Sequence, residues 1–298
     1  MNDAQQIRLF ATLPRDDSDA LFVALDPVLE EAGHALSVFE THEDSGIFEL
    51  SVYAAAGERE NLTDILQKTA QSLAINPTIQ VEILPDEDWV TKSLEGLQPV
   101  RVGRFIVHGS HDRDRVRLSD IGIEIEAGQA FGTGHHGTTA GCLDMMSRVI
   151  RRRRPRQMLD VGTGSAVLAI AAGKAWKLSV LATDIDPIAV DVARRNAALN
   201  DVAQLVDCRV AAGFAHARIR EKGPYDLIVA NILARPLMKM APHFAVHLAP
   251  GGDMILSGIL ATQRHKVLAA FRQQGLYHQR TLWREGWVTL HLRAKTGS

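Results

Sequence analysis

Cysteine is scarce in this chain of 298 residues, which contains only Cys142 and Cys208. Two cysteines supply neither a disulfide framework nor a zinc ligand set, so a reducing cytoplasm is the expected compartment. Long apolar runs are also lacking, and none approaches the roughly 20 residues needed to span a bilayer. The N-terminus has no basic flank followed by an apolar core, as a secretory signal would. The sequence therefore predicts a cytoplasmic protein without a membrane partner.

Aromatic residues and excess charge are limited as well. Aromatics make up 5% of the chain and the formal net charge is −2. There are few rings to stack on bases and no overall positive charge, so direct RNA contact is not expected. Nothing in the sequence demands more than a monomer.

One basic run, RRRRPR at residues 151–156, departs from this balance. It either contacts RNA or an acidic tail, or it ends a helix over residues 142–154. Cations suit the negative pole of a helix, and Pro155 would stop it. We favour the helix end, because solvated basic faces are common.

The first 85 residues predict a small ferredoxin-like α+β domain. Alternating stretches predict strands at 6–13, 35–43, 47–55 and 78–85, and helical spacing predicts helices at 16–33 and 58–73. Asp17 or Ser18 is the expected cap of the first helix. The order β-α-β-β-α-β is that of the ferredoxin-like arrangement, which serves many functions.

Residues 86–120 are the predicted linker and lead-in. They read as a short helix ending before Pro99, a strand over 100–110 and a polar turn at 111–115.

Residues 121–298 form the second predicted domain, in which strands and helices alternate from residue 157 onward. Continuous apolar strands are expected at 157–162, 178–185, 204–210, 225–232 and 253–259, with helices at 165–176, 187–200, 233–248 and 262–275. Such strands indicate a buried parallel sheet. The chain closes with an antiparallel hairpin over 278–294, so the fold class is a doubly wound, Rossmann-like α/β sheet with a C-terminal hairpin.

A glycine loop in LDVGTGSAVLAIAA, residues 159–172, follows the first of these strands. Gly162 and Gly164 allow a sharp turn and a close ligand approach before the next helix begins. A dinucleotide favours G-x-G-x-x-G, but position 167 is valine. S-adenosylmethionine needs only the close backbone, and Asp160 lies where its ammonium group would sit.

Two more strand ends carry polar candidates. Asp184 lies 22 residues after Gly162, where a carboxylate accepts from ribose hydroxyls. Asp186 competes for this role, but it precedes Pro187 and is the better helix cap. Asn231 ends the fourth strand, where it either orients an amine together with the carbonyls of residues 232 and 233, or merely ends the strand and caps a helix. The glycine loop favours the first interpretation.

The stretch AFGTGHHGTTAG, residues 130–141, pairs His135 with His136. A metal site, a phosphate cradle and a cofactor lid are alternatives. Adjacent histidines point in different directions, and no cysteine or acidic pair stands nearby at ligand spacing. A lid or entry loop is favoured, and no metal is expected.

Together, AFGTGHHGTT, LDVGTGSAVLAIAA, ATDIDPIAV and NILARPL resemble the PrmA family, the bacterial methyltransferases of ribosomal protein L11, over nearly the whole chain. The resemblance implies that the N-terminal domain grips the ribosomal protein and that the C-terminal domain binds S-adenosylmethionine. It also implies methylation of lysine and α-amino groups, with S-adenosylhomocysteine as product. Carried over by position, the family's cofactor contacts fall on Thr139, Gly162, Asp184 and Asn231.

The chain departs from the family pattern in two places. In GTGHHGTT, His135 replaces a threonine and Gly137 replaces a proline, which should loosen the loop. Ala166 stands where the family carries a third glycine, and its methyl group fits if φ is negative there.

Three rival functions stay open. The same chemistry can act on a lysine of another protein or on a small amine, although the N-terminal domain favours a protein substrate. Val167 and the lack of a Tyr-Lys or His constellation count against a nicotinamide dehydrogenase. The intact glycine loop, Asp184 and Asn231 count against a non-catalytic adaptor.

Overall fold

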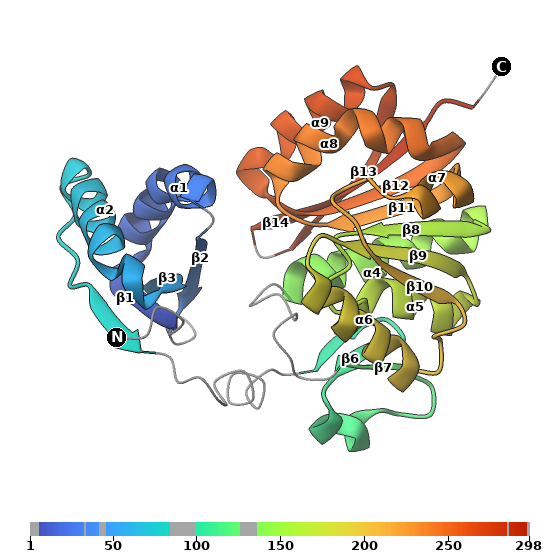
Figure 1. The fold of residues 1–298 in the computed structure, drawn as a ribbon, viewed down its shortest axis with the longest axis horizontal. Helices are drawn as coiled ribbons and strands as arrows, with labels where there is room; N and C mark the ends of the chain where they lie inside the picture. The colour runs from blue at the N-terminus through green and yellow to red at the C-terminus, as the bar shows by residue number, and fades with distance from the viewer. Residues whose placement is uncertain are drawn as a thin grey trace. The chain divides into compact units, whose positions relative to one another are not determined.

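The computed structural model describes residues 6–32, 34–41, 46–83, 99–125, 136–284 and 286–296. The chain divides into two compact units, Met1–Ser93 and Leu94–Ser298 (Figure 1). None of the described helices is both long and apolar enough to cross a membrane.

The first unit is a four-stranded sheet with two helices. Its elements are β1 (Gln6–Pro14), α1 (Arg15–Ala32), β2 (Ala35–Glu40), β3 (Ile47–Ala55), the 3-10 turn η1 (Ala56–Glu58), α2 (Arg59–Ser72) and β4 (Gln80–Ile83). The strands lie in the order β2-β3-β1-β4, and each neighbouring pair is antiparallel. This is the strand order of the ferredoxin-like arrangement predicted from the sequence.

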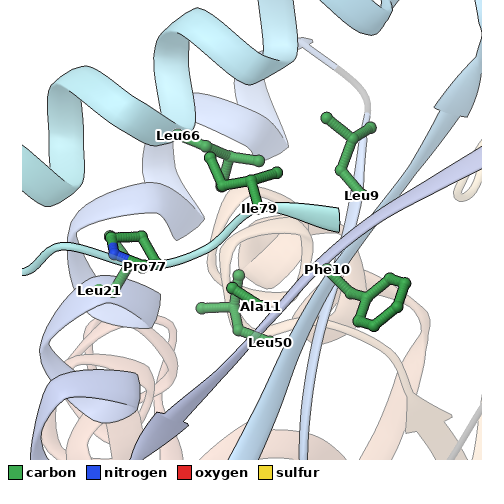
Figure 2. A pocket seen from close by; sticks show the side chains of 8 residues that line it. All are labelled: Leu9, Phe10, Ala11, Leu21, Leu50, Leu66, Pro77 and Ile79. Atoms are coloured by element: carbon green, nitrogen blue, oxygen red, sulfur yellow. The ribbon is translucent and has the colours of Figure 1, made fainter. Parts of the chain in front are cut away.

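Apolar side chains from both helices and the sheet fill this unit's core. Figure 2 shows the lining of a gap between them, which is formed by Leu9, Phe10, Ala11, Leu21, Leu50, Leu66, Pro77 and Ile79. The gap has a volume of about 10 Å³, no more than a single water molecule needs. The core is therefore closely packed, as protein interiors are.

The start of α1 differs from the prediction. The helix begins at Arg15, so Asp17 and Ser18 lie inside its first turns and neither is the cap. Ser18 is fully buried, and its hydroxyl has no hydrogen-bond partner among the described residues. Propensity placed the boundary too late because Pro14 ends β1 and the chain turns directly into the helix.

The second unit opens with a three-stranded sheet, β5 (Val100–Val102), β6 (Phe105–His108) and β7 (Ile121–Glu124), with the 3-10 turn η2 (Ser110–Arg115) between β6 and β7. The single strand predicted at 100–110 is two antiparallel strands, because Gly103 has a φ of +57° and reverses the chain. Val102, Phe105 and Val107 pack into the core of this unit. The helix predicted before Pro99 lies outside the described residues.

The main sheet has seven strands. In chain order the elements are α4 (His136–Arg153), β8 (Gln157–Val161), α5 (Val167–Trp176), β9 (Ser179–Asp184), α6 (Pro187–Leu199), β10 (Val206–Val210), α7 (Ala217–Lys222), β11 (Tyr225–Asn231), α8 (Ala234–His247), β12 (Leu248–Leu260), η3 (Ala261–Gln263), α9 (Arg264–Gln273), β13 (Leu276–Arg284) and β14 (Trp287–Ala294). The strand order is β10-β9-β8-β11-β12-β14-β13, and the first five run parallel. β14 is antiparallel to β12 and β13, which confirms the predicted terminal hairpin.

Helices cover both faces of this sheet. Figure 1 shows α8 and α9 over one face and α4, α5 and α6 over the other. Successive strand residues alternate between the two cores: Met158 and Leu227 join the α4–α6 side, whereas Leu159 and Ile228 join the α8–α9 side. The strands that follow β8 in the chain, β9 and β10, lie toward one edge of the sheet, and those that follow β11 lie toward the other edge. A ligand of a doubly wound sheet binds in the crevice at that switch point, beyond the carboxyl ends of the strands.

The arginine run closes α4 as predicted. Arg151, Arg152 and Arg153 form its last turn, and Arg154 has a φ of +49° just before Pro155. The Arg153 side chain donates to the Asp253 carboxylate and to the carbonyl of Gly251. Part of the run therefore binds its own domain.

Candidate functional site

The glycine loop lies where β8 ends and is tied to β9. Gly162 and Gly164 have φ values of +71° and +54°. The backbone N–H groups of Gly162 and Thr163 donate to the carbonyl of Thr183 at 2.8 and 2.9 Å. A Cβ added at Gly162 would stand 2.3 Å from Cγ2 of Ile232. Only glycine suits this position, both for its backbone angle and for the neighbour from beyond β11.

Asp184 stands at the end of β9 and holds the loop in place. Its Oδ2 accepts from the N–H of Gly164 at 2.8 Å, and its Oδ1 accepts from the N–H of Asp186 at 3.1 Å. A carboxylate offers about four lone-pair sites, so each oxygen keeps one for a ligand hydroxyl. The side chain of Asp186 accepts from the N–H of Ile188 at 2.8 Å, which confirms it as the cap of α6.

Ala166 corrects one expectation. Its φ is +66°, in the left-handed region, and not the negative angle that would suit an alanine methyl group. The residue is fully buried just before α5 begins at Val167. A left-handed conformation costs an L-residue about 1–2 kcal/mol. The loop keeps the backbone shape that a glycine would adopt freely, and packing in the core holds the alanine in it.

Asp160 lies beneath the loop, with only 1% of its surface exposed. Burial raises the pKa of this carboxyl group from 3.8 to about 7; the hydrogen bond from Thr163 opposes the rise, and the charge of Asp184 adds to it. The Thr163 hydroxyl donates to Oδ2 at 2.7 Å. An ammonium group placed nearby would favour the ionised carboxylate. A place near a ligand ammonium stays a prediction for Asp160.

Asn231 and Thr139, 92 positions apart, come together at the end of β11. The Asn231 amide nitrogen donates to the Thr139 hydroxyl over 3.5 Å, and both residues are half-buried. The N-terminal turn of α4 is thus next to the strand end beside the glycine loop. This bond uses the amide nitrogen, and among the described residues the amide oxygen is left available to accept from a substrate N–H.

Two residues of β12, Gly258 and Ser257, contact the chain neighbours of Asn231 and Thr139. Neither was predicted as a site residue. Gly258 has a φ of +78°, and a Cβ added there would stand 2.4 Å from the backbone oxygen of Ile232. Ser257 is fully buried; its hydroxyl donates to the carbonyl of Thr138 at 3.3 Å and lies 3.0 Å from the Thr289 hydroxyl. A glycine inside an apolar strand does signal a close backbone approach. Nothing local in the sequence signals the serine.

The structure does not describe the side chains of the two adjacent histidines. His135 lies outside the described residues, and His136 is the first residue of α4 with an undescribed side chain. Over the part of the chain that the structure describes, no three His, Cys, Asp or Glu side chains gather as a metal site. A lid role for the histidines stays a prediction.

Comparison with known proteins identifies the family of this chain. A family model described as "Ribosomal protein L11 methyltransferase (PrmA)" matches residues 14–295. This chain belongs to the PrmA family. A relative from Rhizobium meliloti (strain 1021), named ribosomal protein L11 methyltransferase, is 54% identical over 287 residues, covering 96% of this chain and 99% of the relative. A relative of the same name from Mesorhizobium japonicum is 51% identical over 288 residues, covering 97% and 99%.

A solved structure agrees with the PrmA assignment. The crystal structure of ribosomal protein L11 methylase from Lactobacillus delbrueckii subsp. bulgaricus is 31% identical, with a TM-score of 0.60, and the match covers 67% of this chain and 98% of that one. The resemblance found in the sequence and the methyltransferase fold are both confirmed. The chain is an S-adenosylmethionine-dependent methyltransferase, and the dehydrogenase and adaptor alternatives are not favoured.

The residues of this PrmA site fit the cofactor. The positive φ of Gly162 leaves a backbone without a side chain at the loop, and Asp184 keeps lone pairs directed from the end of β9. Both features suit a nucleoside with an amino-acid arm, because the bare backbone lets the arm approach closely and a carboxylate accepts from ribose hydroxyls.

Proposed function

We propose that this chain transfers methyl groups to lysine and α-amino groups of ribosomal protein L11. The observation that carries the proposal is the family match over residues 14–295, joined to a site in which Asn231 and Thr139 meet beside the glycine loop. The substrate comes from the names of the relatives.

Thr139, Gly162, Gly164, Asp184 and Asn231 are the proposed cofactor contacts. Gly162 and Gly164 bring bare backbone to the amino-acid arm, and Asp184 accepts from the ribose hydroxyls. When bound, S-adenosylmethionine supplies an electrophilic methyl group and leaves as S-adenosylhomocysteine. Asp160 supports the loop from below and offers negative charge once an ammonium group favours its ionised form.

Asn231 is the proposed catalytic residue, because an amine has to be neutral and aimed before it can attack. A lysine amine of pKa about 10.4 needs roughly 4.6 kcal/mol to lose its proton at pH 7, and an α-amino group needs only about 1 to 1.4 kcal/mol. The amide oxygen of Asn231 accepts one amine N–H, and water takes the proton. The carbonyls of Ile232 and Leu233, expected from the sequence to accept others, have neighbours of their own: the Ile232 oxygen lies against Gly258, and the Leu233 carbonyl accepts from the N–H of Leu237 at 3.3 Å. Orientation of this kind is a large source of rate enhancement.

The division of labour between the units is also part of the proposal. Residues 1–85 recognise the protein substrate, residues 86–120 form the linker and lead-in, and residues 121–298 carry the methyltransferase site. The chain acts as a monomer in the cytoplasm, where ribosomal proteins are made.

Mass spectrometry of purified L11 after incubation with the enzyme and S-adenosylmethionine tests this function. We expect mass additions in steps of one methyl group on lysines and the N-terminus. Asn231→Ala should lower turnover by at least tenfold and change the calorimetric affinity for S-adenosylmethionine less. Gln204→Ala, an exposed amide in the same unit, is the matched control.

Two results would count against the proposal. An unmodified L11 alongside methylation of another purified protein would move the activity to that substrate. Equal losses of turnover and cofactor affinity in Asn231→Ala would remove the orienting role, because an orienting residue acts mainly on the reacting amine.

A further inference from the structure

Two asparagines at the end of α6, Asn196 and Asn200, are buried one helical turn apart and have no part in the site described so far. Asn196 is fully buried, and Asn200 has 3% of its surface exposed. A buried side-chain amide needs hydrogen-bond partners within the protein, because bulk water cannot supply them. The partners of each amide therefore show which part of the fold it holds.

Asn196 holds a carbonyl of the glycine loop. Its Nδ2 donates to the backbone oxygen of Ser165 at 3.0 Å. The nitrogen of the same peptide unit, which belongs to Ala166, donates to the carbonyl of Thr163 at 2.9 Å. The peptide between Ser165 and Ala166 is thus fixed at its oxygen and at its nitrogen.

This peptide sets the backbone angle of Ala166. The φ of Ala166 is +66°, an angle that is unfavourable for a residue with a Cβ. The peptide is planar, so turning it changes the φ of the residue that follows. Ala166 would gain by leaving the left-handed region, and the hydrogen bond from Asn196 opposes that movement.

The neighbouring residue of the loop is held from another element. Oδ2 of Asp184, at the end of β9, accepts from the N–H of Gly164 at 2.8 Å. Gly164 and Ser165 are consecutive, so β9 and α6 each fix one of two adjacent residues. A turn of the peptide after Ser165 would pull on Gly164, whose backbone is a proposed contact of the cofactor.

Asn200 has different partners. Its Oδ1 accepts from the N–H of Glu124 at 3.0 Å and from Nζ of Lys174 at 3.1 Å. Its Nδ2 donates to the carbonyl of Glu124 at 2.6 Å and to that of Asn196 at 2.9 Å. These contacts join the end of β7 to α5 and α6, and none of them reaches the glycine loop.

We propose that Asn196 is a positioning residue for cofactor binding. By fixing the carbonyl of Ser165, it keeps Ala166 left-handed and the glycine loop in the shape that S-adenosylmethionine meets. This chain needs the hydrogen bond because an alanine stands where a glycine would adopt the angle freely. The inference rests on the proposed contacts of the glycine loop and Asp184 with the cofactor.

Calorimetric titration of S-adenosylmethionine into the full-length chain tests the inference, at a temperature below the unfolding of every variant. Asn196→Leu removes the donor with little change in side-chain size, and it should raise Kd about tenfold or more, or about 1.4 kcal/mol. Asn200→Leu is the matched control, because it removes a buried amide one turn further along the same helix. It should lower Tm as Asn196→Leu does and leave Kd within about twofold of the wild type.

Ala166→Gly separates positioning from a general loss of structure. Glycine adopts the left-handed angle without the Cβ penalty. Ala166→Gly should therefore lower the Kd of Asn196→Leu by about threefold or more, and change that of the wild type by less than about twofold. If the leucine variants do not fold, Asn196→Ala and Asn200→Ala give the same comparison, because they also remove the amides.

Equal rises in Kd for Asn196→Leu and Asn200→Leu would overturn the inference, as would a Kd of Asn196→Leu that Ala166→Gly leaves unchanged. Asp184→Ala separates this failure from a failure of the proposed cofactor contacts. Weakened binding in Asp184→Ala beside wild-type binding in Asn196→Leu removes only the positioning role. Wild-type binding in Asp184→Ala removes its contact with the cofactor, and the positioning role with it.

Discussion

Replacing Gly162 with alanine should destabilise the second unit and displace the strand end that carries Asn231. The backbone at Gly162 has a φ of +71°, and the new Cβ would stand 2.3 Å from Cγ2 of Ile232. At that separation one of the two residues has to move. Ile232 directly follows Asn231, so the movement reaches the proposed amine-orienting group.

Two separate costs set the size of the effect. A left-handed φ costs an alanine about 1–2 kcal/mol, and a methyl group forced into a filled space costs about 1–3 kcal/mol. The free energy of unfolding should fall by about 2–5 kcal/mol. Each kcal/mol lowers Tm by roughly 2–4 °C in a domain of this size, so the expected drop in Tm is about 4–20 °C.

Gly275→Ala is the matched control for this prediction. Gly275 has a φ of +77°, but a Cβ added there has no atom within 4 Å. The free energy of unfolding of Gly275→Ala should fall only by the cost of the left-handed backbone, about 1–2 kcal/mol. The difference between the two variants measures the clash with Ile232.

A double-mutant cycle with Ile232→Ala completes the assay. That change removes Cγ2, so Gly162→Ala should cost about 1–3 kcal/mol less in its background than in the wild type. Thermal unfolding followed by circular dichroism measures all four proteins. Strictly additive losses, or a Gly162→Ala protein that melts together with Gly275→Ala, would refute the proposed close approach.

Three further predictions follow from buried groups. Ser18→Ala should raise the free energy of unfolding of the first unit by about 1 kcal/mol in urea titrations, since the buried hydroxyl has no partner among the described residues; a loss would contradict this. Asp160 holds its proton to about pH 7 when folded, against 3.8 unfolded. The contribution of Asp160 to stability should therefore fall as pH rises from 4 to 7, by up to about 4 kcal/mol, and the Tm of the wild type should fall relative to that of Asp160→Asn over this range. Gly258→Ala brings a Cβ within 2.4 Å of the Ile232 oxygen and should lower turnover and Tm more than Gly275→Ala does.

Local sequence patterns predicted most elements of the fold. Apolar strands, helical spacing and terminal glycines located the main sheet, and the Asp186-Pro187 pair located the cap of α6. α7 was missed because its six residues, ARIREK, bury only Ile219 and carry little apolar periodicity. β5 and β6 were taken as one strand because Gly103 does not interrupt the alternation around it. The segments 84–98 and 126–135 lie outside the described residues, so the predictions placed there are still untested.

The sequence by itself determined the family, the order of elements and the residue types at the strand ends, because these depend on neighbours a few positions apart. Only the tertiary structure decided which of these residues meet. Asn231 reaches Thr139 across 92 positions, and Ser257 reaches the carbonyl of Thr138 across 119. It also decided the left-handed angle of Ala166 and the approach of Gly258 to Ile232. Such meetings follow from strand register and helix packing, which are set by the whole core and not by any local stretch of chain.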